Sequence, residues 1–450
     1  MTSYEWGNDL NEGGPRRDGD GSNQGFLQHP AHLHPQTPRK SKRWIWVAIG
    51  VIIAVVLALG LGIGLTIGRK ASTSADNKPP IPTPPGPKPP IAPPGDAGRP
   101  TILLAETKLA TVHRDDTLGN DIHAVYYQSA SGALMVSQWN SSTRAWNATN
   151  ISAALDAVGR PIRPQNGTAL AVDHPNGPVQ GGTDDGFLVN VRYVSVADNP
   201  EYIVGPAAAA GAWTLGTLSN YAPPPVSKGS QMAAIYDGCA SGCTGTSVFL
   251  YENASQELIV FKNVFGNRDW DQYRFEEFTS FRVVPEPGAA LTMTRFTPSG
   301  ERKEATGLRM YVDVSRQLQE YSWTGGDAQW VHTSKQWPLS DPDARDDTYH
   351  APWISATSWN STAGSGPKNI LLALLFNNGS IVVHWLDEPT GSWATGFPSP
   401  TNVSALALND NMRAYCVQNG QIREYDIDMS RPASWKFVSN VTSLATDGST

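Results

Sequence analysis

The chain has 450 residues, which is more than one ordinary domain uses unless its architecture is a repeat. Its formal net charge is −7, and acidic residues outnumber basic ones only after residue 100. An acidic segment such as residues 101–450 is a poor partner for nucleic acid or anionic lipid, so the sequence argues against nucleic-acid binding.

Residues 1–43 are rich in Gly, Asn, Pro and His and show no apolar period, which predicts a disordered tail. Residues 44–68 carry no charge. A helix of that length, at about 1.5 Å per residue, spans a hydrocarbon core of about 30 Å. The apolar run is longer than that of a cleaved signal peptide and starts later, so we expect an uncleaved transmembrane signal anchor.

Charge and glycosylation sequons predict the same orientation for this segment. Four basic residues precede it closely and two follow it, which places the N-terminus in the cytosol by the positive-inside rule. Nine Asn-X-Ser/Thr sequons all follow it: Asn140, Asn147, Asn150, Asn166, Asn253, Asn360, Asn378, Asn402 and Asn440. The expectation is a single-pass membrane glycoprotein whose C-terminal part is extracellular or lumenal.

Residues 69–100 form the expected linker to a head comprising residues 101–450. Half of residues 79–100 are proline, so this linker favours an extended polyproline II conformation. In the head, Cys239 and Cys243 could pair in an oxidising compartment, and Cys416 is expected to be buried. No second pair of ligands accompanies the CxxxC spacing, and we expect neither a metal nor a cofactor.

Short alternating runs bounded by turn signals fill the head and predict an all-β fold. They group into six units, each with a first strand of small residues and a tryptophan near its end. Those tryptophans are Trp146, Trp213, Trp270, Trp330, Trp393 and Trp435. The pattern favours a six-bladed β-propeller of four-stranded blades over a pair of β-sandwiches or a seven-bladed ring. Small first strands would let six strands converge on one axis.

Two units repeat a polar layout. In residues 308–330, LRMYVDVSRQLQEYSWTGGDAQW, the expected second strand carries Arg309 and the third carries Glu320, eleven positions later. In residues 412–435, MRAYCVQNGQIREYDIDMSRPASW, Arg413 and Glu424 have the same spacing. A guanidinium fork, a carboxylate and an indole can together bind the hydroxyls and apolar face of a sugar. The candidate carbohydrate-binding residues are Arg309, Glu320, Trp330, Arg413, Glu424 and Trp435.

This order of Arg, Glu and Trp resembles that of the fungal fucose-specific lectins, which are six-bladed propellers. The resemblance implies fucose sites between neighbouring blades and fucosylated glycans as partners. His123 stands where the first unit would have its arginine. The same spacing gives Phe249 and Val260 in the third unit and Leu372 and Val383 in the fifth, which cannot make polar contacts. The second unit offers no clear pair.

Two other functions remain open. The Arg–Glu pairs could be cross-strand ion pairs in a degenerate propeller used as a protein-interaction scaffold. A glycosidase needs a pair of carboxylates, and the acidic run at residues 341–347 lies between units, so we do not expect an enzyme. The sequence leaves the oligomeric state open, with a homodimer as one possibility.

Overall fold

A computed structural model describes residues 103–442, with gaps at 117, 175–187, 207–212, 238–245, 265–269, 276–281, 297–306, 325–329, 339–350, 361–366 and 388–390. The expected tail, transmembrane segment and linker lie outside the described residues. So do Cys239, Cys243 and the acidic run at 341–347. Within the described part, no helix is long and apolar enough to cross a membrane.

The described head consists of six antiparallel sheets, each made of four consecutive strands. We call these sheets blades 1 to 6 in chain order. Blade 1 contains β1 (Ala110–Asp115), β2 (Asp121–Gln128), β3 (Leu134–Asn140) and β4 (Ala145–Asn150). Blade 2 contains β5 (Leu170–Asp173), β6 (Leu188–Val194), β7 (Pro200–Pro206) and β8 (Thr214–Leu215). Blade 3 contains β9 (Met232–Asp237), β10 (Thr246–Glu252), β11 (Leu258–Val264) and β12 (Asp271–Arg274). Blade 4 contains β13 (Leu291–Phe296), β14 (Gly307–Val314), β15 (Gln317–Thr324) and β16 (Val331–Pro338). Blade 5 contains β17 (Trp353–Asn360), β18 (Pro367–Leu375), β19 (Ile381–Asp387) and β20 (Ser392–Gly396). Blade 6 contains β21 (Val403–Leu408), β22 (Arg413–Gln418), β23 (Gln421–Ile427) and β24 (Trp435–Asn440).

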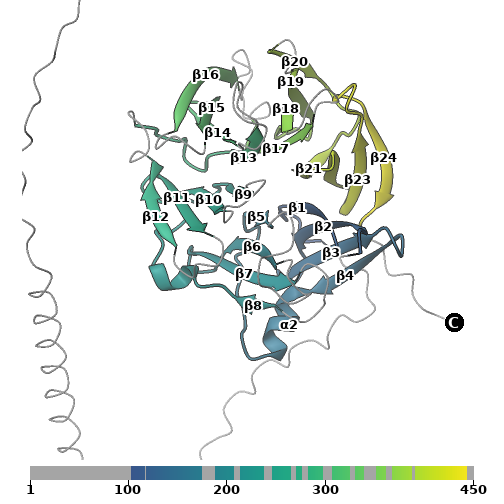
Figure 1. Ribbon diagram of the computed structural model, residues 1–450. Helices are drawn as coiled ribbons and strands as arrows, with labels where there is room; N and C mark the ends of the chain where they lie inside the picture. Colours follow the sequence, from purple (N-terminus) through teal and green to yellow (C-terminus); the bar gives the residue numbers. More distant parts are fainter. Residues whose placement is uncertain are drawn as a thin grey trace, which may run out of the picture. The chain divides into compact units, whose positions relative to one another are not determined.

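The blades form a closed ring. Their first strands contact one another in the order β1, β5, β9, β13, β17 and β21, and β21 contacts β1 again. Figure 1 shows these strands around the centre and the fourth strands at the rim. The predicted six-bladed propeller is confirmed. The described residues include the α-helix α2 (Ile151–Ala157) and the 3-10 turn η1 (Leu218–Tyr221).

Small residues on the first strands let the six blades approach the axis closely. Ala110, Ala171 and Ala233 are among those that line the narrow part of the central channel. Gln231 crosses between blades there. Its Nε2 donates to the Ile354 carbonyl (2.9 Å), and its Oε1 accepts from the Leu291 amide (3.1 Å). The channel widens elsewhere into a cavity of about 600 Å³.

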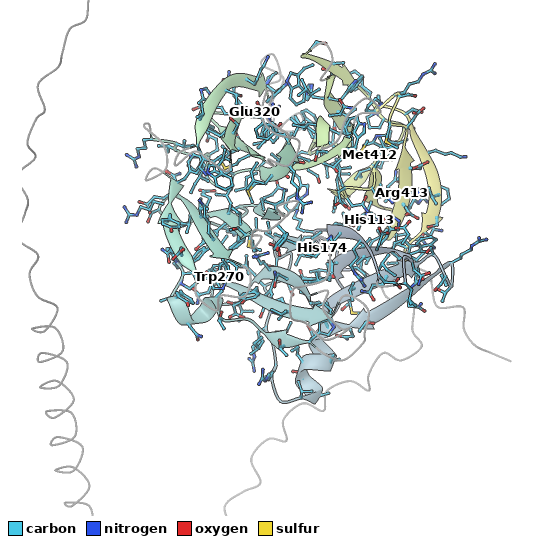
Figure 2. The ribbon with its side chains drawn as sticks, in the orientation of Figure 1. His113, His174, Trp270, Glu320, Met412 and Arg413 are labelled. Atoms are coloured by element: carbon cyan, nitrogen blue, oxygen red, sulfur yellow. The ribbon has the colours of Figure 1, made fainter. Side chains whose placement is uncertain are left out.

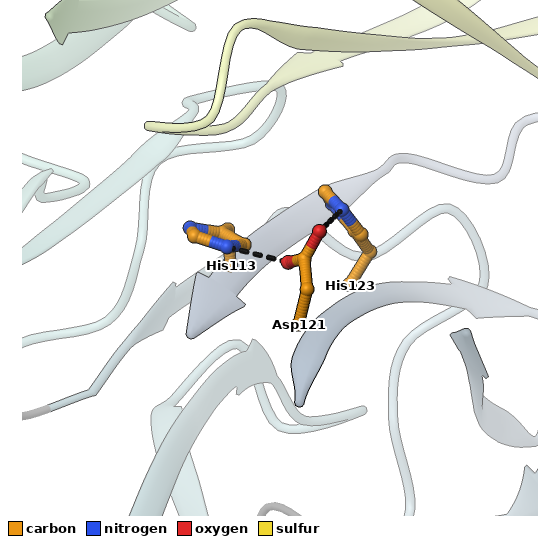
Figure 3. A group of neighbouring side chains, drawn as sticks. All are labelled: His113, Asp121 and His123. Atoms are coloured by element: carbon orange, nitrogen blue, oxygen red, sulfur yellow. Dashed lines mark hydrogen bonds and ion pairs between the residues drawn. The ribbon is translucent and has the colours of Figure 1, made fainter. Parts of the chain in front are cut away.

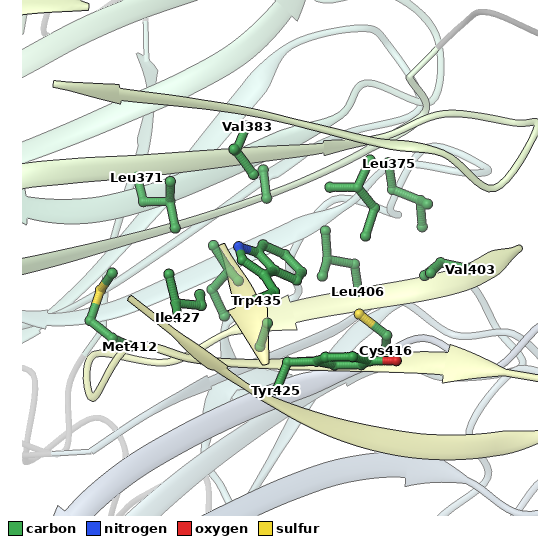
Figure 4. Close-up of a cluster of buried hydrophobic side chains, with 14 of the residues drawn as sticks. Leu371, Leu375, Val383, Val403, Leu406, Met412, Cys416, Tyr425, Ile427 and Trp435 are labelled. Carbon is green, nitrogen blue, oxygen red and sulfur yellow. The ribbon is translucent and has the colours of Figure 1, made fainter. Parts of the chain in front are cut away.

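Each pair of neighbouring blades shares one hydrophobic cluster, so the head has six clusters rather than one core. We call the contact between two blades a junction, numbered by its blades. Figure 4 shows the cluster of the 5–6 junction, with Tyr425 and Cys416 from blade 6 and Val383 from blade 5. The prediction that Cys416 is buried is confirmed, and Tyr321 and Tyr425 are buried as well.

Candidate functional site

The spacing of eleven residues brings arginine and glutamate onto the same face of a blade. In blade 4, Tyr311 pairs directly with Glu320 across β14 and β15, and Arg309 lies two residues before Tyr311. Residues two apart on a strand share a face. The Arg309 Nη1 therefore reaches the Glu320 Oε2 at 3.4 Å. Blade 6 repeats this register with Tyr415 opposite Glu424, as the common spacing predicts.

Glu320 is held by three neighbours and is buried. The Tyr311 hydroxyl donates to its Oε2 (2.7 Å), and the Thr333 hydroxyl donates to its Oε1 (2.7 Å). The Arg309 guanidinium lies 4.6 Å from the ring centroid of Phe296. Gly307 makes room for that ring, because a Cβ there would come within 2.5 Å of it. The carboxylate is thus engaged, and the guanidinium, 16% exposed, is the more accessible group.

Glu424 has the same anchors with a different ion pair. The Ser439 hydroxyl donates to its Oε2 (2.8 Å) and the Tyr415 hydroxyl to its Oε1 (3.3 Å). Burial raises the pKa of Glu424, although Ser439 and Arg413 oppose the shift. The Arg413 Nη1 instead lies 3.4 Å from Asp426, and its side chain is 26% exposed. Figure 2 locates Arg413 and Glu320 in different parts of the ring.

The structure does not bring Trp330 to Arg309 and Glu320. Its indole is 3% exposed and packs against Phe275, at 5.5 Å between ring centroids, in the 3–4 junction. Tyr311, which shares a face with Arg309, belongs to the cluster of the 4–5 junction. Trp330 therefore lies on the opposite side of its own blade from the polar pair.

Trp435 has the same placement in blade 6. It is 5% exposed and lies in the 5–6 cluster, where Leu371 and Val383 of blade 5 are its neighbours (Figure 4). Its indole N–H donates to the Pro432 carbonyl (2.9 Å). Trp435 thus faces the preceding blade, while Glu424, which shares a face with Tyr415, faces the following one.

Each junction that holds a polar pair also receives a tryptophan from the next blade, Trp393 at 4–5 and Trp146 at 6–1. At the 6–1 junction, the Trp146 N–H donates to the Ser439 hydroxyl (3.1 Å), which in turn donates to Glu424. The Trp146 ring also meets Tyr415 edge-on at 6.1 Å. At the 4–5 junction, Trp393 packs against Trp337 at 4.8 Å, and Trp337 packs against Tyr311 at 5.9 Å.

A register shift accompanies the Arg–Glu pair in both blades. The pairing of β23 with β24 shifts by one residue between Glu424 and Tyr425, which moves Trp435 to the face opposite Glu424. The pairing of β15 with β16 shifts by two residues between Gln319 and Tyr321, so the alternation of faces is kept, and Trp330 lies on the face opposite Glu320 by strand alternation alone. In the described residues of the other four blades, the third and fourth strands pair without a shift. The shift thus marks the two blades that carry the Arg–Glu pair.

The other blades lack that pair on the equivalent face. In blade 3, Val260 takes the glutamate position opposite Leu250, so the arginine position falls on Val248 rather than on Phe249. In blade 5, Val383 pairs with Ala373, so the arginine position falls on Leu371 rather than on Leu372. These positions are apolar, as the sequence suggested, although the spacing of eleven missed the arginine position by one residue.

The first unit needs a correction of a different kind. His123 does not take an arginine position, because it faces blade 6, where its Nδ1 contacts the Asn409 Nδ2 at 3.1 Å. It therefore belongs to the 6–1 junction, beside Arg413, and not to the junction that blade 1 forms with blade 2.

Arg192 of blade 2 was not singled out by the sequence. It is fully buried at the 2–3 junction, paired with Asp173 at 3.1 Å and hydrogen-bonded to the Ser247 hydroxyl at 2.6 Å. The rings of Phe249 and Trp270 cover its guanidinium at 5.0 and 5.6 Å. This cation is enclosed by its own protein and offers no surface to a ligand.

Within the described residues, His113, Asp121 and His123 form one group with the spacing of metal ligands. In Figure 3, Asp121 lies between the two imidazoles, 2.7 Å from the His113 Nε2 and 3.2 Å from the His123 Nε2. The Asn409 Oδ1 accepts the amides of Asn411 and Arg413, so its Nδ2 must face His123.

The His123 Nδ1 is then an acceptor, and its Nε2 carries the proton that Asp121 accepts. A metal would need the lone pair of that Nε2, and ligating histidines normally donate from the other nitrogen. We assign the trio as a hydrogen-bonded chain. Burial lowers the pKa of His123 to about 4, which keeps the imidazole neutral.

The ring of blades and its two matched junctions define a six-bladed β-propeller. Fungal lectin structures with this fold are similar to the chain. AofleA from Arthrobotrys oligospora has a TM-score of 0.55 at 17% identity, over 76% of this chain and 88% of that one. A mutant Aleuria aurantia lectin in complex with α-methyl-L-fucoside has a TM-score of 0.56 at 17% identity, over 78% and 99%.

SapL1 lectin in complex with α-methyl fucoside has a TM-score of 0.52 at 18% identity, over 76% of this chain and 98% of that one. At these identities, the likeness establishes the fold. No protein-family model and no curated protein matches the sequence.

Proposed function

We propose that the chain is a carbohydrate-binding protein that recognises fucose-bearing glycans at its 4–5 and 6–1 junctions. The observation that carries this proposal is the repeated set of arginine, glutamate and tyrosine on one blade with a tryptophan on the next. The similar Aleuria aurantia and SapL1 structures hold α-methyl fucoside, which supports fucose as the sugar.

Each group would have a defined part in binding. The guanidinium of Arg309 or Arg413 would donate to a ring oxygen and a neighbouring hydroxyl. The indole of Trp393 or Trp146 would cover the methyl group and the C–H face of the sugar. Because hydroxyls already donate to both oxygens of each glutamate, its main part would be to orient the arginine, and a ligand hydroxyl must compete for it.

The most direct test is a glycan array, followed by titration of Arg309→Ala, Arg413→Ala and the double variant. The wild type is expected to bind fucosylated glycans selectively. Each single variant should keep one class of site, and the double variant should keep none while its melting temperature hardly changes. Intact binding by the double variant would show that the sites lie elsewhere, and a blank array would favour the scaffold function.

We also propose that binding occurs without hydrolysis. Both common glycosidase mechanisms use two carboxylates. At the 4–5 junction, the set of arginine, glutamate and tyrosine contains a single carboxylate, Glu320. At the 6–1 junction, two hydroxyls already bond Glu424, and Asp426 is paired with Arg413. Release of free sugar in the same assay would contradict this.

Finally, we propose that a membrane anchor at residues 44–68 displays the head outside the cytosol. Its uncharged length and the flanking charges support this proposal. Protease added to intact cells should then remove the head and spare the tail, and the opposite pattern would reverse the orientation.

A further inference from the structure

The two candidate junctions share their core set but differ in what lies beside it. On the following blade, Trp139 pairs with Trp146 at the 6–1 junction, whereas Leu386 pairs with Trp393 at the 4–5 junction. On the arginine-bearing blade, Arg413 pairs across the strands with Asp426, whereas Arg309 pairs with Ser322.

Blade 1 presents a row of four rings to blade 6. His113 pairs with His123, His123 with Trp139, and Trp139 with Trp146, across all four strands of the blade. Directly paired residues point to the same side of a sheet. The ring centroids of His113 and His123 are 5.1 Å apart, and those of His123 and Trp139 are 5.5 Å apart.

The outer half of that row is open to solvent. Trp139 and Trp146 are both half-buried, while His123 beside them is buried. At the 4–5 junction, Leu386 and Ile370 fill the equivalent places and are buried. The 6–1 junction thus offers two neighbouring half-buried indoles, whereas at the 4–5 junction Trp393 is half-buried and its neighbour Trp337 is buried.

The facing surface of blade 6 adds polar groups next to those indoles. Asp426 is 53% exposed and lies 3.4 Å from the Arg413 guanidinium. At the 4–5 junction, the guanidinium of Arg309 turns inward to Glu320, and Trp337 packs between Tyr311 and Trp393. The 4–5 junction is therefore the more closed of the two.

From these differences we propose that the 6–1 junction binds two linked sugar rings, while the 4–5 junction binds a single terminal ring. The inference rests on the proposed function and specifies its ligand. One ring lies against Trp146 and Arg413, and the second lies against Trp139 with its hydroxyl or amide N–H groups directed at Asp426. An indole suits the apolar face of the second ring, and a carboxylate accepts from its donors.

The test isolates each junction in the full chain. Arg309→Ala should leave only the 6–1 junction able to bind, and Arg413→Ala only the 4–5 junction. Each variant is titrated with α-methyl fucoside and with the disaccharide Fucα1-6GlcNAc, and the affinity ratio of disaccharide to monosaccharide is compared. We expect a ratio of about 10 at the 6–1 junction, equal to about 1.4 kcal/mol, and a ratio near one at the 4–5 junction.

Substitution of the second indole should remove that preference. In the Arg309→Ala background, Trp139→Leu installs the residue found at the other junction and should lower the ratio to about one. Trp139→Phe keeps an aromatic face and should retain part of it. Asp426→Ser, which copies Ser322, should lower the ratio less than Trp139→Leu does.

The outcomes separate the two proposals. Equal ratios at both junctions, or a ratio that survives Trp139→Leu in a variant with an unchanged melting temperature, would overturn the two-ring assignment and leave fucose binding intact. Absence of binding by either sugar at either junction would instead overturn the proposed function, and with it this inference.

Discussion

At the residue scale, the position of the tryptophan decides what the polar pair can do. Glu320 and Glu424 are anchored by hydroxyls from their own blades, and the junction that each faces also holds an indole from the next blade. A site of this kind exists only when the ring is assembled. Trp330 and Trp435, in contrast, fill apolar junctions in which valines take the glutamate position.

The two kinds of tryptophan should respond differently to truncation. Trp435→Ala removes a buried indole and should lower the free energy of unfolding by about 3–5 kcal/mol. Trp146→Ala removes a half-buried one, so it should cost less stability but eliminate binding at the 6–1 junction. Denaturant unfolding and sugar titration of both variants measure this. Loss of sugar binding by a folded Trp435→Ala variant, with binding by Trp146→Ala unaffected, would contradict this. It would show that the sugar site combines Arg413 and Glu424 with the tryptophan of their own blade.

The sequence could predict that arginine and glutamate share a face of each blade, because a two-residue hairpin and strand alternation fix the geometry locally. Arg309 and Glu320 are related by a single turn, so their spacing sets their face. The tryptophans could not be placed this way. The one-residue bulge that moves Trp435 to the face opposite Glu424 leaves no simple mark in the sequence. Which face of a blade meets the preceding or the following blade is a property of the closed ring.

At the element scale, the hairpins of blades 4 and 6 form the same two-residue turn with different residues. Ser315 and Arg316 adopt φ of 55° and 60°, and Asn419 and Gly420 adopt 51° and 73°. Two positive φ values in a two-residue loop favour Asn-Gly. The turn of blade 4 was predictable from its position between two alternating runs, but its backbone conformation was not.

Transfer of the Asn-Gly turn should stabilise blade 4. The double variant Ser315→Asn/Arg316→Gly removes a side chain from the left-handed region and should raise the free energy of unfolding by about 1 kcal/mol. Gly420→Ala is the matched control. It should lower stability by a similar amount, because an added Cβ there meets nothing within 4 Å and only the backbone conformation is penalised. Denaturant midpoints of both variants check the pair, and equal midpoints would contradict it.

At the scale of the whole molecule, the 6–1 junction closes the ring. Every described blade is made of four consecutive strands, so side-chain contacts alone join the last blade to the first. His113 contributes through both nitrogens, at 2.7 Å from Asp121 and 3.6 Å from Asp410 of blade 6. His123 lies 5.1 Å away, and the His174 Nε2 is bonded to the His113 carbonyl.

This contact should make the stability of the ring depend on pH. Burial lowers the pKa of His113, but Asp410 and Asp121 outweigh it, so the pKa is raised above the usual value. A raised histidine pKa stabilises the fold below about pH 6.5 and loses that effect as the pH rises through the folded value. The free energy of unfolding of the wild type minus that of His113→Gln should therefore be larger at pH 6 than at pH 8.5, by up to about 1 kcal/mol. A difference that grows toward pH 8.5 would contradict the ion-pair assignment.

The six-bladed architecture was the most predictable feature, because the six tryptophan-bearing units and their first strands of small residues are visible in the sequence. The contribution of His123 to the opposite junction was not predictable, since it follows from ring closure and from the side chain of Asn409.

The central claim is that each sugar site is shared by two blades. A crystal structure of the chain with α-methyl fucoside tests it most directly. We predict sugar at the 4–5 and 6–1 junctions, in contact with the guanidinium of Arg309 or Arg413 and the indole of Trp393 or Trp146. Sugar bound beside Trp330 or Trp435, or only in the central channel, would contradict it.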